Sequence, residues 1–149
     1  MSIWRNLKTL EALNAKSAGT LNGHLDIVFT EIGDDFIRAT MPVDERTRQP
    51  YGLLHGGASV ALAETVGSMG AFMCIDSSQY LCVGQEINAN HVRSARHGRV
   101  TGTARPVHLG GRSQVWTIDI VDESQALICI SRLTMAVIKK GAVGPAKSG

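Results

Sequence analysis

Apolar residues change their spacing several times along the chain. Two short runs rich in β-branched and aromatic residues, 25–32 and 36–41, are separated by Gly33-Asp34-Asp35. Such runs, bounded by turn residues, are typical of strands, so the pattern predicts a hairpin. Ahead of it, residues 9–13 predict a short helix that begins after Thr9 as its N-cap.

Residues 58–75 follow a different pattern, in which apolar and small residues fall on every side of a helix. A helix that is apolar all round is buried. Glu64 lies in its middle, and Ser68 follows one turn later on the same face. An unpaired carboxylate is costly to bury, so Glu64 must be neutralised, hydrogen-bonded or turned towards a cavity. The alternative is a structural Glu64 that reaches solvent or a second subunit.

A glycine-rich turn, Gln49-Pro50-Tyr51-Gly52-Leu53-Leu54-His55-Gly56-Gly57, leads into this helix. The first amides of a helix have no intrahelical partners and lie at the positive end of its dipole. They therefore form a site for an anion or a polarised carbonyl oxygen. Glycines at Gly56 and Gly57 would leave that site open to a ligand.

After residue 79 the chain is strand-like. Four runs, 80–92, 99–109, 113–122 and 126–138, are separated by turn signals at 96–98, 110–111 and 122–124. Successive strands with short connections favour an antiparallel sheet. A sheet that curls round the long helix buries it, which predicts an α+β domain. The edge strands of such a sheet need protection, so we expect a homodimer that continues the sheet.

Length and composition predict one domain over residues 1–138 and a disordered tail over 139–149. The net charge of +2, without a long basic run, argues against a nucleic-acid partner. No apolar signal region is present at the start and Glu64 interrupts the long helix, so we expect no membrane partner and a cytoplasmic protein. Cys74, Cys82 and Cys129 form no CxxC motif and suit reduced, buried thiols.

Several reaction classes lack their motifs. Residues 57–61 fail the G-x-S-x-G pattern of serine hydrolases because Ala61 takes the last position. The five histidines show neither HExxH nor another metal spacing, and no P-loop or dinucleotide motif follows a strand. We therefore expect no metal and no cofactor.

Blocks of residues along nearly the whole chain resemble one family. They are Ile3-Trp4, Met41-Pro42-Val43-Asp44, the stretch 49–68, Asn88-Ala89-Asn90-His91-Val92-Arg93-Ser94, Pro106-Val107-His108-Leu109-Gly110 and Arg132-Leu133-Thr134. With them the chain resembles the hotdog-fold acyl-CoA thioesterases of the phenylacetate-catabolism type. That resemblance implies an antiparallel sheet of about six strands wrapped round one long central helix.

The resemblance also implies roles for the residues around the turn and the helix. Glu64 would be the catalytic carboxylate, as nucleophile or as general base for water. The Gly56 amide would hold the thioester carbonyl, with His55 and Gln49 orienting thioester and water and Ser68 beside Glu64. In this family the site lies between subunits, so a homodimer with shared sites, and a homotetramer, are expected.

A second set of residues is expected to bind the substrate. By the resemblance, the CoA nucleotide and pantetheine lie along Gly84, His91, Val92, Arg93, Ser94, His108, Leu109, Gly110, Gly111, Arg112 and Ser113, with Met69 at the acyl pocket. Arg93, Arg112 and the double-glycine turn suit phosphate groups. The alternative for both arginines is a solvated strand end. His24 and His97 lie outside the matching blocks, and we expect no site role for them.

The acyl group is the least determined feature. The chain looks most like the 1,4-dihydroxy-2-naphthoyl-CoA thioesterases of menaquinone biosynthesis and the enterobactin-pathway proofreading thioesterases, which act on an aroyl-carrier protein. Residues 90–96 favour the first and residues 67–69 the second. We place hydrolysis of an aromatic acyl-CoA first. The rivals are a non-catalytic acyl-CoA-binding protein and a hotdog dehydratase that uses His55 with Glu64.

Overall fold

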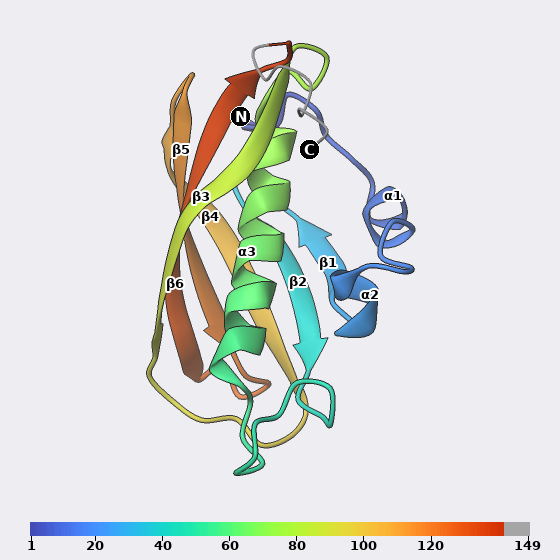
Figure 1. Cartoon of the computed structure of the whole chain (residues 1–149), viewed down its shortest axis with the longest axis vertical. Helices are drawn as coiled ribbons and strands as arrows, with labels where there is room; N and C mark the ends of the chain where they lie inside the picture. Colours follow the sequence, from blue (N-terminus) through green and yellow to red (C-terminus); the bar gives the residue numbers. More distant parts are fainter. Residues whose placement is uncertain (142–149) are drawn as a thin grey trace, which may run out of the picture.

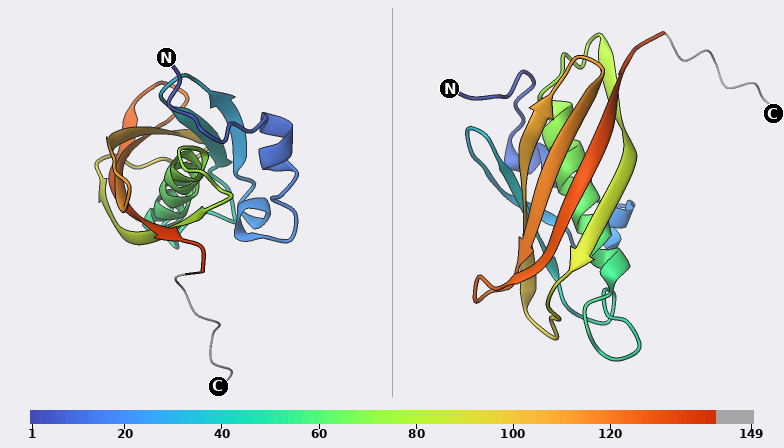
Figure 2. Two further views of the ribbon diagram at one scale, coloured as in Figure 1. Left: turned by 90° about the horizontal axis from the view of Figure 1, so that it is seen from above. Right: turned by 90° about the vertical axis from the view of Figure 1, so that its left-hand side faces the viewer.

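The computed structural model describes residues 1–141. Its elements are α1 (Leu10–Asn14), α2 (Leu21–His24), β1 (Val28–Ile32), β2 (Ile37–Pro42), α3 (Gly56–Met73), β3 (Tyr80–His91), β4 (Arg99–Leu109), β5 (Ser113–Val121) and β6 (Leu127–Lys139). The strands form one antiparallel sheet of order β1-β2-β4-β5-β6-β3. The sheet curves round α3 (Figures 1 and 2). The predicted α+β architecture of a sheet wrapped round a helix is confirmed.

Helix α3 lies close to the concave face of the sheet because two of its glycines meet large side chains. A Cβ at Gly70 would come within 2.8 Å of the Trp116 ring, and one at Gly67 within 2.7 Å of Leu133 Cδ2. Trp116 and Leu133 are fully buried. The missing side chains therefore set the distance between helix and sheet.

One side of α3 differs from the prediction of a helix buried all round. Seven residues spaced three or four apart are only half-buried: Val60, Ala61, Glu64, Thr65, Ser68, Met69 and Phe72. This spacing defines a single stripe along a helix. The strands cover the other sides of α3, and on this side the Thr65 hydroxyl donates to Asn22 Oδ1 of α2 at 3.1 Å. Within residues 1–141, the stripe that carries Glu64 is therefore only partly covered.

The chain before β1 also differs from the sequence expectation. The start of the predicted strand, residues 25–27, instead follows the short helix α2, and Asp26 takes a left-handed backbone with φ 51°. Asp and Asn tolerate this conformation better than other residues with side chains. Leu25 and Ile27 are nevertheless buried, as core residues of the expected strand would be. The N-cap of α1 is confirmed, since the Thr9 hydroxyl accepts from the Ala12 amide at 3.2 Å.

The N-terminal arm closes the far end of α3. The amides of Arg5 and Asn6 both donate to the carbonyl of Met73, the last residue of the helix, at 2.9 Å. Trp4 stacks on Trp116 with ring centroids 6.4 Å apart. At the other terminus, β6 extends to Lys139, one residue beyond the expected domain boundary. Most of the expected tail, residues 142–149, lies outside the described residues.

An irregularity in β3 decides which of its side chains face α3. The pairing of β3 with β6 shifts register between Gly84 and Glu86, so Gln85 is an extra residue in β3. Gly84 and His91 are seven positions apart, and a regular strand would turn them to opposite faces. With the bulge, Gly84 faces Glu64 and His91 faces Gly56.

Candidate active site

The first turn of α3 leaves one amide free. His55 is the N-cap, and its Nδ1 accepts from the Gly57 amide at 2.8 Å. The His55 carbonyl accepts from the amides of Ala58 and Ser59, at 3.0 and 3.2 Å. Within residues 1–141, no hydrogen bond of the backbone or a side chain uses the Gly56 amide. It therefore points to a position where a ligand oxygen can accept from it.

The hydrogen bond from Gly57 also defines the state of the His55 ring. A nitrogen that accepts carries no proton, so the neutral ring holds its proton on Nε2. Nε2 can then donate to a second group beside the free amide. His55 is exposed, so such a group can approach from solvent.

Glu64 lies two turns further along α3, on the half-buried stripe. None of the ion pairs formed by residues 1–141 involves it. A Cβ at Gly84 of β3 would overlap the Glu64 carboxylate, so this glycine provides the space that the carboxylate occupies. Ser68 lies on the same stripe, but its hydroxyl donates to Met135 Sδ at 3.7 Å. Ser68 and Glu64 thus lie on one face of α3, as their spacing of four residues predicts.

The free amide and the carboxylate do not meet within one chain. Eight residues separate Gly56 from Glu64 along α3, which corresponds to about 12 Å at the rise of an α-helix. A thioester held by the Gly56 amide would lie outside the reach of the same chain's Glu64.

A pocket of about 360 Å³ opens beside the start of α3. Its lining combines predicted site residues with others: Gln49, Leu53, Leu54, Gly56, Ser59, His91, Val92, Arg93, Ser94 and Ile128. The Gln49 side chain is half-buried and its Oε1 accepts from the Tyr51 amide. The structure thus brings Gln49, Gly56 and residues 91–94 together, as expected.

Four lining residues of this pocket were not singled out by their sequence. Leu53, Leu54 and Ser59 lie inside the recognised glycine-rich block, where their neighbours carried the signal. Ile128 lies in β6, and it reaches the pocket because the Val92 amide donates to its carbonyl at 2.9 Å. No local sequence pattern predicts such a contact between distant segments.

Predicted CoA-binding residues of the β4–β5 connection lie at the opposite end of α3. Leu109, Gly110 and Gly111 line a separate pocket of about 370 Å³ together with residues that follow the helix, including Cys74, Ile75 and Asp76. The 18 residues of α3 span about 27 Å between the two ends. One chain therefore places residues 91–94 and 109–111 of the expected CoA-binding set in two separate pockets, with Gly84 between them beside Glu64. His24 and His97 line neither pocket.

The thiols and the acidic residues give no sign of another chemistry. Cys74, Cys82 and Cys129 are free. Burial raises the pKa of Cys74 to about 12 and that of Cys82 to about 11, so both thiols are protonated at neutral pH. In the part of the chain that the structure describes, no cluster of three or more His, Cys, Asp or Glu side chains is arranged to hold a metal ion. No helix of that part is long and apolar enough to cross a membrane.

An antiparallel six-stranded sheet wrapped round one long central helix is the hotdog fold that the sequence resemblance implied. The model of the thioesterase superfamily matches residues 51–129, which include all of α3, the strands β3, β4 and β5, and the start of β6. The chain belongs to this family, and it is a thioesterase.

Relatives of known name agree with this class. The chain is 60% identical over 136 residues to the 1,4-dihydroxy-2-naphthoyl-CoA hydrolase of Escherichia coli, covering 91% of this chain and 99% of the relative. It is 54% identical to the proofreading thioesterase EntH of Cronobacter sakazakii, covering 91% and 98%. The crystal structure of a mutant thioesterase from Pseudomonas aeruginosa matches with a TM-score of 0.91 and 51% identity, covering 93% and 99% of the two chains.

Proposed function

We propose that this thioesterase hydrolyses aromatic acyl-CoA, with 1,4-dihydroxy-2-naphthoyl-CoA as its first candidate substrate, to the free acid and CoA. The observation that carries the proposal is the free Gly56 amide at the start of α3 together with Glu64 on the half-buried stripe of the same helix. The identity of 60% to a hydrolase named for that substrate supports the choice of acyl group.

The chemistry follows from the two groups. Oxygen attacks the thioester carbon, and the carbonyl oxygen gains negative charge that the Gly56 amide and the helix dipole stabilise. Glu64 either takes the proton of the attacking water or attacks first and forms an anhydride that water then opens. The C–S bond breaks, and the CoA sulfur leaves as thiolate and takes up a proton. His55, with its proton on Nε2, and Gln49 orient the thioester and the water.

The reaction requires two chains, and the edge of β3 provides a way to join them. Among residues 1–141, β3 pairs only with β6, so its other edge has no partner strand in that part of the chain. If two β3 strands pair antiparallel with Gly84 opposite the partner's His91, the Glu64 carboxylate beside Gly84 comes next to the partner's Gly56. The same association would cover the half-buried stripe of α3. We therefore propose a homodimer with two shared sites, and a homotetramer formed from two such dimers.

A second candidate substrate is an aroyl group on a carrier protein. Identity of 54% to the proofreading thioesterase EntH favours it. The pocket at the start of α3 is lined in part by the apolar side chains of Leu53, Leu54, Val92 and Ile128, and apolar contacts discriminate weakly between similar acyl groups. We place the reaction in the cytoplasm, where thiols such as Cys74 and Cys129 stay reduced.

Release of free thiol from a panel of substrates tests the proposal. The panel contains 1-hydroxy-2-naphthoyl-CoA as a stable analogue, benzoyl-CoA, a medium-chain acyl-CoA and an aroyl-carrier protein. It is run for the wild type, for Glu64→Gln and for Glu11→Gln, a matched change on the surface of α1. We expect kcat of Glu64→Gln to fall about 10³-fold because the base or nucleophile is lost. Glu11→Gln should behave like the wild type.

Each result bears on a different part of the proposal. The order of kcat/KM over the panel separates acyl-CoA from carrier-protein substrates. Absence of thiol release by the wild type from every substrate would contradict hydrolysis and return the binding and dehydratase alternatives. Full activity of Glu64→Gln would leave hydrolysis standing and remove Glu64 from its assigned role.

A further inference from the structure

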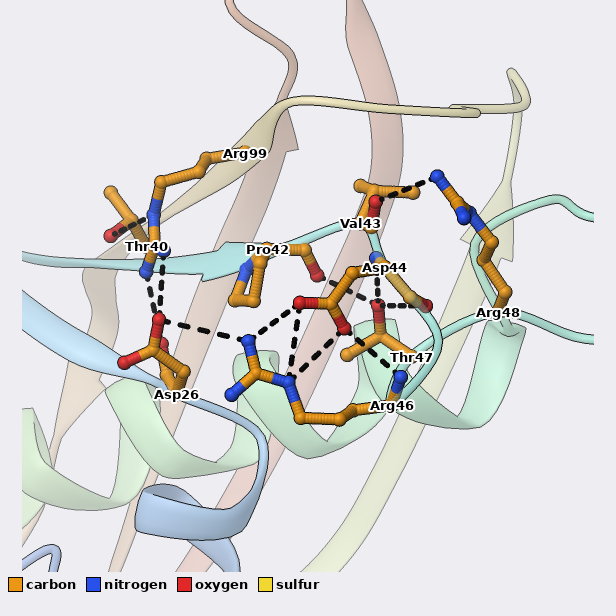
Figure 3. A network of polar contacts seen from close by, with 9 residues as sticks. All are labelled: Asp26, Thr40, Pro42, Val43, Asp44, Arg46, Thr47, Arg48 and Arg99. Atoms are coloured by element: carbon orange, nitrogen blue, oxygen red, sulfur yellow. Dashed lines mark hydrogen bonds and ion pairs between the residues drawn. The ribbon is translucent and has the colours of Figure 1, made fainter.

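A buried threonine lies between the core and the first turn of α3. Thr47 is only 1% exposed, although it belongs to the polar segment that joins β2 to α3. Its hydroxyl donates to the Pro42 carbonyl at 2.7 Å and accepts from the Asp44 amide at 3.1 Å. Figure 3 shows these contacts at the centre of a polar network. Thr47 is thus joined to the end of β2 by its side chain.

The backbone of the same residue holds the start of α3. The carbonyl of Thr47 accepts from the His55 amide at 2.8 Å. The His55 ring is held in turn because its Nδ1 accepts from the Gly57 amide. A continuous series of hydrogen bonds therefore runs from Pro42 through Thr47 and His55 to the turn that presents the free Gly56 amide.

The residues around Thr47 anchor the rest of the segment. The Arg48 guanidinium donates to the carbonyls of Arg96 and Val43, at 2.7 and 3.2 Å. The Leu54 amide donates to the Ala95 carbonyl at 2.8 Å. The Asp44 carboxylate accepts from the amide and the guanidinium of Arg46, and hydrogen bonding to Arg46 holds the pKa of Asp44 below its usual range. These contacts fix both flanks of the loop 49–53 but do not reach His55 directly.

Thr47 is the buried residue that links the end of β2, through its hydroxyl, to the start of α3, through its carbonyl. Loss of its hydroxyl would leave the Asp44 amide without its side-chain acceptor and the Pro42 carbonyl without its donor, in a place that solvent reaches poorly. The segment would move to satisfy them, and the Thr47 carbonyl would move with it. Because catalysis depends on placement to within about 1 Å, a small shift of His55 and Gly56 is enough to lower the rate.

We infer that Thr47 is a positioning residue of the thioesterase site, whose buried hydroxyl sets the location of His55 and of the Gly56 amide. The inference rests on the proposed function for its kinetic consequence, since the hydrolytic roles of His55 and Gly56 belong to that proposal. Its structural part stands on the hydrogen bonds of Thr47 alone.

Three variants separate positioning from stability. Thr47→Val keeps the shape of the side chain and removes the hydroxyl, whereas Thr47→Ser keeps the hydroxyl. Asn14→Leu is the matched control, because Asn14 bonds both the amide and the carbonyl of Phe29, at 2.8 and 2.9 Å, far from the start of α3. For each we would measure Tm, kcat and KM for the best substrate, and hydrogen exchange of a peptide covering residues 54–60.

The expected result is a loss that only Thr47→Val shows. Its kcat should fall about 10- to 100-fold at a temperature where it remains folded, and exchange over residues 54–60 should accelerate. Thr47→Ser should stay within about twofold of the wild type, and Asn14→Leu should lose Tm without losing kcat. Wild-type kcat in folded Thr47→Val, or an equal loss of kcat in Asn14→Leu, would overturn the inference.

The exchange measurement keeps the two proposals distinguishable. If the wild type releases no thiol, the proposed function fails, and exchange over residues 54–60 still reports whether Thr47 holds the helix start. If the wild type is active and exchange in Thr47→Val is unchanged, the positioning role fails while the proposed function stands.

Discussion

Gly84 has no side chain, and the Glu64 carboxylate occupies the space that a side chain at this position would fill. In Gly84→Ala the new methyl group would overlap the Glu64 carboxylate, which is the far end of a flexible side chain and can turn away. We therefore expect kcat to fall about 10²-fold while Tm changes little, since the displaced group lies on a half-buried stripe. Val83→Ala, on the neighbouring exposed position, serves as the control. A loss of Tm with kcat retained would contradict this role of Gly84.

The raised thiol pKa values make stability sensitive to alkaline pH. Burial raises the pKa of Cys74 from 9.0 to about 12 and that of Cys82 to about 11. The protonated thiols contribute stability that is fully present below about pH 9, the unfolded value, and is lost as pH rises towards these folded values.

Melting curves in reductant test this dependence. Between pH 8 and pH 10.5, the wild type should lose more Tm than Cys74→Ala, because the variant lacks one of the three thiols whose pKa burial raises. Equal losses of Tm in both proteins would contradict the raised pKa of Cys74.

At the level of residues, the sequence predicted candidate site residues best where a short local pattern identifies their chemistry. The glycine-rich turn before an apolar helix predicted the open amide at Gly56, and a carboxylate in an apolar helix marked Glu64. Ile128 escaped notice because its contact with Val92 comes from a distant strand. Thr47 escaped notice because it lies in a polar segment, where nothing in the sequence marks a hydroxyl that is buried against the Pro42 carbonyl. Ser68 shares a face of α3 with Glu64, as its spacing predicts, whereas the hydrogen bond from its hydroxyl to Met135 depends on the packing of α3 on β6, which no local pattern shows.

Helix α3 owes its position to glycines that its own stability would not favour. In Gly70→Ala the gain in helix propensity, about 1 kcal/mol, is opposed by overpacking against the rigid Trp116 ring, which costs about 1–3 kcal/mol. We expect net destabilisation in urea unfolding of Gly70→Ala. Gly67→Ala should lose less, because its new methyl group meets the end of the Leu133 side chain. A gain in stability of Gly70→Ala would show that the sheet yields easily.

At the level of elements, periodicity predicted what depends on one face of a strand or helix. The hairpin, the long helix and the four later strands follow from alternation and turn residues. The short helix α2 was missed since Leu25 and Ile27 are as apolar as strand residues, and only the left-handed Asp26 separates them from β1. The bulge in β3 was also missed, although Gly84, a glycine inside a strand and next to Gln85, is a signal for one.

For the whole molecule, the separation of Gly56 and Glu64 along α3 predicts that inactive chains complement each other. Glu64→Ala and His55→Ala should each be inactive alone. When the two are co-expressed in equal amounts, a site formed from one intact Glu64 and one intact His55 should arise in about one quarter of cases, if chains associate at random in a symmetric oligomer. Thiol release at about a quarter of the wild-type rate would be expected.

The control is a mixture of the two proteins made without exchange of chains, which should stay inactive. Activity that remains absent after co-expression, in an oligomer shown by light scattering to contain both chains, would mean that each chain completes its own site. The half-buried stripe of α3 would then need another explanation.

The bulge at Gln85 has a consequence for how this family can change. Side chains alternate between the two faces of a strand, so the one added residue in β3 reverses this alternation beyond it. Gly84 and His91 therefore share a face although their spacing is odd. Loss of a single residue anywhere between them would restore the regular phase and turn one of the two away from α3. Gains or losses of residues between Gly84 and His91 are therefore compatible with an intact site only in even numbers, whereas substitutions at Gln85 that keep the count leave the phase unchanged.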